Sequence, residues 1–259
     1  MPKYAIAAAA LLWAALCGPL AAAVHAQAAD ATPPLPHPHW SFSGIFGTYD
    51  RAALQRGFQV YKQVCSACHP LSHLTYQDLA ALGYSEDEIK AIAAQYQVTA
   101  GPNAKGEMYK RPAQPADHFV GPFPNEQAAR AANGGALPPD LSMIVKARAG
   151  GPDYVYGIET GFVPPPKGFT VPPGRYYNLY FPGHLIAMPP PLHPNEVTFA
   201  DGTPATVPQM AHDVVTFLTW ASHPNLEARH SIGFSVMLFL IVGVIVFYAA
   251  KRKIWSAVH

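Results

Sequence analysis

Apolar residues recur along this chain at helical spacing, and polar or proline-rich stretches separate them. From Tyr49 to Val64 the large apolar side chains fall three to four positions apart, which predicts an amphipathic helix. Shorter patterns of the same kind predict helices at 85–92, 125–132, 140–148, 154–160 and 212–222. The pattern therefore predicts a mainly α domain.

Glycine and proline dominate the segments between these helices. Thr99–Pro124 and Val163–Pro194 contain almost no helix-forming stretch, so both predict long loops. The pair Asp201–Gly202 predicts a small hairpin, and the proline-rich segment Ala31–Pro38 predicts an extended arm. We expect irregular loops to make up much of this domain.

The first of two uninterrupted apolar runs lies at the N-terminus. Lys3 precedes an alanine-rich apolar stretch, Ala5–Leu16, and small residues continue to Ala26. A short apolar core followed by small residues is typical of a secretory signal, with cleavage after Val24–Ala26. A retained membrane helix is the alternative, which the short, alanine-rich core disfavours.

The second apolar run lies near the C-terminus. Ile232–Ala250 contains no charge and is followed directly by Lys251–Lys253. As a helix it would be about 28 Å long, enough to cross a bilayer, and the three cations mark its cytoplasmic end. The expected organisation is a cleaved signal, an exported domain, a membrane helix and a cytoplasmic tail, at 1–26, 27–230, 231–250 and 251–259.

The charge of the exported part is small and negative. Between Gln27 and Arg229 there are sixteen acidic and thirteen basic residues, a net charge of −3. No nucleic acid partner is expected, and a mildly acidic surface of this kind suits a basic protein partner.

The motif Cys65-Ser66-Ala67-Cys68-His69 carries the chemistry. Cys-x-x-Cys-His is the attachment signature of c-type haem, in which both thiols add to the haem and the histidine becomes an axial iron ligand. A thioredoxin-like site is the first alternative, but no strand–motif–helix unit surrounds the motif here, and this interpretation would leave His69 unexplained. A zinc knuckle would need a second ligand pair, and no cysteine follows Cys68.

The residues alone leave two candidates for the sixth iron ligand. Met188 lies in a proline-rich loop that holds a side chain in place at low entropic cost. His184 lies four residues earlier on the same loop. Met143 falls on an apolar face of the helix predicted at 140–148 and is expected to fill the core instead.

At this point the chain resembles cytochrome c1, the haem subunit of the respiratory cytochrome bc1 complex, of the alphaproteobacterial or mitochondrial type. The resemblance covers nearly the whole mature chain. It rests on the segments Arg56–Tyr61, Asn125–Ser142, Asp153–Tyr154, Tyr180–Gly183, Ala187–Pro189, Asp201–Thr206, Asp213–Trp220 and Lys251–Ser256.

The resemblance implies one haem c, bound covalently through Cys65 and Cys68. It implies that His69 and Met188 ligate the iron, which favours Met188 over His184.

Three further residues are assigned by the same resemblance. It suggests that the Pro138 carbonyl accepts a hydrogen bond from the His69 ring, which would fix the tautomer of the ligand. It also places Arg148 and Tyr154 near the haem propionates. For Arg148 a plain surface cation at a helix end is the alternative.

The function implied is electron transfer, as the redox subunit of a quinol–cytochrome c reductase without independent substrate catalysis. The expected partners are cytochrome b, the Rieske iron–sulfur protein and a c-type cytochrome acceptor, within a dimeric complex. The inner membrane would hold the single-pass anchor and the periplasm the haem domain.

Two other functions are weighed against electron transfer. A haem peroxidase would need an open iron and an acid/base residue such as His184 or His73. A membrane-anchored electron shuttle would need a flexible linker, but Trp220–Ser231 is short.

Overall fold

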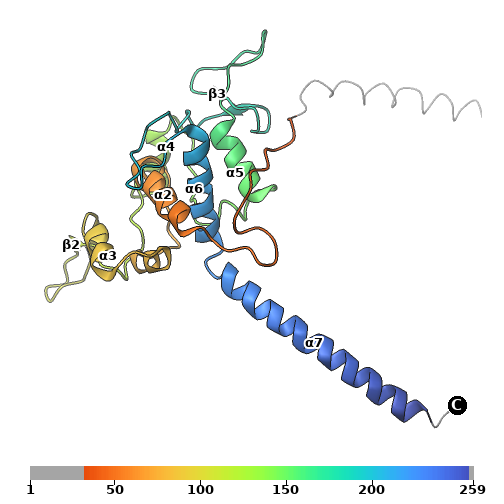
Figure 1. The fold of residues 1–259 in the computed structure, drawn as a ribbon. Coiled ribbons are helices and arrows are strands. Elements are labelled where there is room, and N and C mark those ends of the chain that lie inside the picture. Colours follow the sequence, from red (N-terminus) through yellow and green to blue (C-terminus); the bar gives the residue numbers. More distant parts are fainter. Residues whose placement is uncertain (1–31, 257–259) are drawn as a thin grey trace, which may run out of the picture.

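The computed structural model describes residues 32–256, which form a mainly helical domain and one long helix that projects from it (Figure 1). The predicted signal at 1–26 lies outside the described residues, as does the end of the predicted tail. The helices are α2 (Arg51–Gln63), η1 (Cys65–Ala67), η2 (Tyr76–Leu82), α3 (Glu86–Ala93), α4 (Glu126–Ala132), α5 (Gly151–Thr160), α6 (Val207–Ser222) and α7 (Leu226–Trp255).

Side chains at the helix N-termini explain where several helices begin. Asp50 caps α2, Asn125 caps α4 and Thr206 caps α6, each by accepting backbone N–H groups that lack a partner inside the helix. Ser85 and Glu88 form a reciprocal capping box at the start of α3, as their spacing predicts.

The structure departs from the sequence prediction at two loops. Thr99–Pro124 is not all loop, because β1 (Gln97–Ala100) pairs antiparallel with β2 (Tyr109–Pro112). A second pair, β3 (Tyr176–Tyr177) with β4 (Leu185–Ile186), lies within the proline-rich segment. At Asp201–Gly202 the chain turns without forming the predicted hairpin, because no strands flank the turn.

The prediction of a helix at 140–148 is also wrong. The segment forms successive turns, and the Asp140 carboxylate accepts hydrogen bonds from Ser72 as well as from the Ser142 backbone. A tertiary contact has therefore replaced a helix cap. Met143 is 37% exposed, so the prediction that it fills the core is wrong as well.

Two helices far apart in sequence, α2 and α6, cross at the centre of the domain (Figure 1). Their backbones approach so closely that a Cβ atom on Gly57 would lie 2.0 Å from the Asp213 carbonyl oxygen. Around this crossing Phe58 and Tyr61 of α2 pack against Phe217 of α6. Glycine at position 57 is thus what allows the two aromatic faces to meet.

A buried ion pair fixes the register of the same two helices. Arg56 donates from Nε to Asp213 at 2.7 Å and from a terminal nitrogen to Asp201 at 2.7 Å. The Asp213 side chain is fully buried and also accepts from Gln209 at 3.0 Å. These hydrogen bonds compensate the desolvation of the charge and raise the pKa of Arg56.

Only three residues separate the end of α6 from the start of the long helix α7. Within residues 32–256 it is the candidate membrane span, with a mean hydropathy of 2.6 in its most apolar stretch, none of which is buried by the rest of the chain. It begins at Leu226, six residues before the apolar run, so its first turns belong to the domain. There Glu227 accepts from the Tyr49 backbone and from Arg51, both at 2.7 Å.

Gly57→Ala is expected to lower the free energy of unfolding by about 1–3 kcal/mol, because the new methyl group forces α2 and α6 apart. Thermal unfolding of the full chain in detergent measures this as a fall of roughly 2–10 °C in the midpoint. Gly233→Ala is the control, since a Cβ atom there meets nothing within 4 Å. Equal midpoints for the two variants would contradict the close crossing.

Candidate functional site

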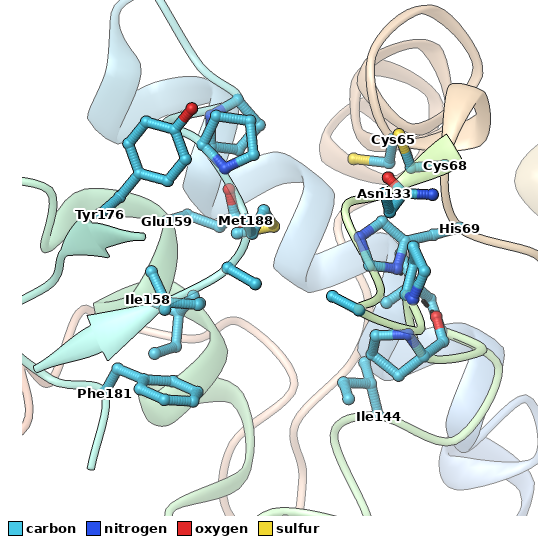
Figure 2. Close-up of a pocket in the computed structure, with 18 of the residues that line it drawn as sticks. Cys65, Cys68, His69, Asn133, Ile144, Ile158, Glu159, Tyr176, Phe181 and Met188 are labelled. Atoms are coloured by element: carbon cyan, nitrogen blue, oxygen red, sulfur yellow. Dashed lines mark hydrogen bonds between the residues drawn. The ribbon is translucent and has the colours of Figure 1, made fainter. Parts of the chain in front are cut away.

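A cavity of about 620 Å³ opens between the Cys-x-x-Cys-His motif and the loop that carries Met188. This volume lies within the usual range of small-molecule and cofactor sites, about 300–1,000 Å³. Figure 2 shows Cys65, Cys68 and His69 on one wall, with Met188 on the facing wall. Most of the remaining lining is apolar, including Leu141, Ile144, Val155, Ile158, Phe181, Ile186, Val214 and Leu218.

The end of α2 positions the two cysteines. The helix stops at Gln63, and the chain continues as the short turn η1, in which the Cys68 and His69 amides both donate to the Cys65 carbonyl. Both thiols are free and half-buried, and burial raises the pKa of Cys65. The turn brings two thiols and one imidazole to one edge of the cavity within five residues.

The His69 ring is held by the Pro139 carbonyl, which lies 2.8 Å from Nδ1. This corrects the acceptor expected from the resemblance, because Pro138 only lines the cavity. A carbonyl oxygen can only accept, so Nδ1 carries the proton and Nε2 keeps a free lone pair. Burial lowers the pKa of His69, which favours the neutral ring that ligates metals.

The Pro139 carbonyl is itself fixed by bonds between the two segments. Leu141 donates its amide to the Pro70 carbonyl at 2.9 Å. Asp140 accepts from the Ser72 amide at 3.1 Å and from the Ser142 amide at 2.7 Å. The two residues that follow the acceptor, Asp140 and Leu141, are thus tied to Ser72 and Pro70, which follow His69, so the ring orientation is set by the fold.

Met188 reaches the cavity from the loop that follows β4. The pairing of Tyr177 with Leu185 fixes the start of this loop, and Pro189 restricts the backbone after it. His184, the competing ligand, is buried elsewhere: its ring stacks on Tyr177 at 5.3 Å and contacts the Asn178 carbonyl. Neither His184 nor His73 lines the cavity.

Arg148 and Tyr154, both expected near the propionates, line the cavity. Arg148 is exposed, and one of its terminal nitrogens donates to the adjacent Ala147 carbonyl. Arg175, which sequence reasoning missed, lines the same cavity from the loop before β3. Two guanidinium groups therefore border the site, an arrangement suited to carboxylate groups.

Glu159 was also missed by sequence reasoning. It lies on the face of α5 that lines the cavity, next to Ile158 and one turn after Val155, and Figure 2 shows it on the Met188 wall. Its Oε2 atom is shielded from water without a hydrogen-bond partner, and burial raises the pKa of this carboxyl to about 7. A charged residue on the apolar side of a predicted helix was the available signal.

These residues fit haem c. The cavity supplies two thiols on one edge, a neutral imidazole with a free Nε2 and a thioether on the facing wall. It also contains a buried carboxyl oxygen that no protein group satisfies. Within residues 32–256 no three His, Cys, Asp or Glu side chains gather as a metal-ion site. A mainly helical domain built around such a cavity is the architecture of a c-type cytochrome.

Comparison with known proteins makes the assignment more specific. The model of the Cytochrome C1 family matches residues 40–258, and the chain belongs to this family. It is 48% identical over 249 residues to "Cytochrome c1" of Rhodospirillum rubrum, covering 90% of this chain and 92% of that protein. It is 45% identical over 249 residues to "Cytochrome c1 1, heme protein, mitochondrial" of Arabidopsis thaliana, covering 95% and 81%. The family is the haem subunit of the bc1 complex.

One relative is much longer than this chain. "Cytochrome b/c1" of Bradyrhizobium diazoefficiens is 48% identical over 256 residues, but the chain spans only 37% of its length.

The mainly helical domain with one apolar C-terminal helix is consistent with the family fold.

Asp140→Ala is expected to lower the free energy of unfolding of the holoprotein by about 1–3 kcal/mol, because the Ser72 and Ser142 amides lose their acceptor. Thermal unfolding in detergent measures the loss. The matched control is Asp87→Ala, whose side chain is 96% exposed and whose pair with Lys90 contributes little. A loss no larger than that of the control would show that Asp140 does not hold the loop behind His69.

Proposed function

We propose that this chain is the electron-transfer subunit of a quinol–cytochrome c oxidoreductase. It passes single electrons from a Rieske iron–sulfur protein, through one covalently bound haem c, to a c-type cytochrome. The observation that carries the proposal is the placement of Cys65, Cys68 and His69 on one wall of the cavity and Met188 on the facing wall. When bound, haem c supplies reversible one-electron chemistry at its iron.

The protein residues then have separate tasks. Cys65 and Cys68 would hold the haem covalently, and His69 and Met188 would ligate its iron. The Pro139 carbonyl keeps the His69 ring in its ligating tautomer. Arg148, with Tyr154 beside it, lies where it can pair with a propionate.

The presence of two candidate iron ligands, His69 and Met188, on opposite walls of the cavity is the reason we favour electron transfer over peroxidase chemistry. A peroxidase needs an open iron position, which a Met188 ligand would close. The two histidines considered for acid/base work, His184 and His73, do not line the cavity. Members of the cytochrome c1 family are redox subunits of an oxidoreductase complex.

The connection between α6 and α7 supports a fixed subunit over a free shuttle. Three residues separate Ser222 from Leu226, and Glu227 is bound by both the Tyr49 backbone and Arg51. A shuttle needs a flexible linker to reach separate donors and acceptors. A domain held this closely to its anchor must instead be approached by its partners, which we propose to be the Rieske iron–sulfur protein and a c-type cytochrome.

The proposed location is the inner membrane, with the haem domain in the periplasm and a cleaved signal at 1–26. The cations Lys251–Lys253 at the end of α7 support this orientation, because cytoplasmic ends carry the positive excess. Within a dimeric complex α7 would pack against cytochrome b.

Co-purification tests the proposed complex. Affinity purification of the full chain from detergent-solubilised membranes is expected to recover a cytochrome b and a Rieske iron–sulfur protein in stoichiometric amounts. The purified assembly should reduce a c-type cytochrome with a quinol as electron donor. Recovery of the chain alone, at native expression, would leave the shuttle as the better account.

Met188→Leu is expected to keep the haem covalently bound but to lower its reduction potential. A thioether ligand raises the potential, and the shift falls within the roughly 0.8 V range over which axial ligands act. Redox titration of the purified holoprotein measures it. Met143→Leu is the control, since that methionine is 37% exposed and does not line the cavity. An unchanged potential in Met188→Leu would exclude this ligand.

Glu159→Gln is expected to remove a pH dependence of the reduction potential near neutrality. Above about pH 7 the carboxylate form is populated and stabilises ferric iron, so the wild-type potential falls as pH rises, by at most about 59 mV per unit. The variant should stay at the level that the wild type shows at low pH. The control is Glu86→Gln, whose side chain is 91% exposed. If the variant keeps the wild-type slope, another group is responsible.

A further inference from the structure

Two large apolar side chains stand out at a turn near the start of the domain. Ile45 is 74% exposed and Phe46 is 73% exposed, more than any other large hydrophobic residue described before α7. The segment from Ser41 to Thr48 contains no charged residue. A soluble surface rarely presents two adjacent apolar side chains without a partner.

The turn is built to hold these side chains outward. Thr48 donates its amide to the Ser41 carbonyl at 3.1 Å, which closes the base of the loop. Gly44 has a φ of 79°, and a Cβ atom on Gly47 would lie 2.2 Å from the Phe42 carbonyl oxygen. Because both glycines are required by the backbone, the outward position of Ile45 and Phe46 follows from the fold.

The turn lies against the first turns of α7, and its contacts change in character along the helix. Nearest the domain, Glu227 forms an ion pair with Arg51 at 2.7 Å. One turn later His230 donates from Nδ1 to the Gly47 carbonyl at 3.0 Å. One further turn along, Phe234 contacts Phe46, with ring centroids 6.2 Å apart. The order is charged, then polar, then apolar.

This order matches the passage from water into a bilayer. The apolar run of α7 begins at Ile232, between the His230 contact and the Phe234 contact. Aromatic residues gather at the level where a membrane span enters the lipid. The Phe46 ring lies at that level, beside the span instead of within it.

We propose that the Ile45–Phe46 turn is a second membrane contact, which inserts into the lipid interface beside the outer end of α7. The inference rests on the proposed function, because it requires α7 to span the membrane. Lipid is the occupant because the exposed side chains continue the apolar surface of α7, and the nearest charged pair, Arg51–Glu227, lies on the domain side of the contact.

The second contact has a consequence for electron transfer. A single helix leaves a domain free to rotate about the helix axis and to tilt. The turn and α7 together give two points of attachment, and the bonds from Glu227 and His230 make them one unit. The mouth of the haem cavity then keeps one orientation relative to the bilayer surface.

The test uses the full-length holoprotein in phosphatidylcholine nanodiscs. Ile45→Cys and Phe46→Cys are labelled with an environment-sensitive fluorophore, and lipids with a quencher high on the acyl chain are included. Phe234→Cys in α7 is the reference for this depth. Met108→Cys, on the β1–β2 hairpin and 62% exposed, is the matched control in water. The unsubstituted chain, treated with the same reagent, gives the background.

Loss of fluorescence at positions 45 and 46 is expected to match that at 234 and to exceed clearly that at 108. If the loss of fluorescence at 45 and 46 only equals that at 108 while position 234 is quenched, the inference is overturned, although α7 still spans the membrane. If 234 is not quenched either, the membrane span fails instead. If lipid quenching at 45 and 46 disappears in the purified complex with cytochrome b, the turn is a protein contact and the inference is overturned.

Discussion

The hydrogen bond between the His69 ring and the Pro139 carbonyl is the contact on which the site depends. It joins the haem motif at the end of α2 to a segment seventy residues later, and it decides which ring nitrogen faces the cavity. The fold protects this bond twice, through the Leu141 amide on Pro70 and through Asp140 on Ser72. A ligating histidine in a rigid tautomer needs no rearrangement when the charge on iron changes, which suits electron transfer.

The second constraint is that the domain, besides its packed hydrophobic core, closes around a cavity. The α2–α6 crossing at Gly57 and the Arg56–Asp213 pair form the rigid base of the domain. The walls of the cavity are α5, the 139–148 turns and the Met188 loop, and their apolar faces would be exposed to water unless a cofactor covers them. Haem c is large, planar and mostly apolar and carries two acidic propionate groups, and the lining has matching features, including Arg148 and Arg175. In this account the cofactor is a structural element as well as the redox centre.

Local chemistry made much of this predictable from sequence. The Ser85–Glu88 capping box of α3 and the apolar spacing of α2 and α6 are local signals, so the corresponding helices were anticipated. The turns at 140–148 could not be, because Asp140 is recruited by Ser72 from elsewhere in the chain. The resemblance named the Pro138 carbonyl as the acceptor from His69, while the fold presents that of Pro139. Arg175 and the Ile45–Phe46 turn acquire meaning only from what lies beside them in space.

The central claim is that one cavity holds the haem iron between His69 and Met188. X-ray absorption at the iron edge of the purified, oxidised holoprotein tests it directly, because the technique counts the nitrogen and sulfur neighbours of the metal. The account predicts five nitrogens, four from the porphyrin and one from His69, together with one sulfur. A sixth nitrogen or oxygen neighbour in place of the sulfur, from a second histidine or from water, would contradict the account.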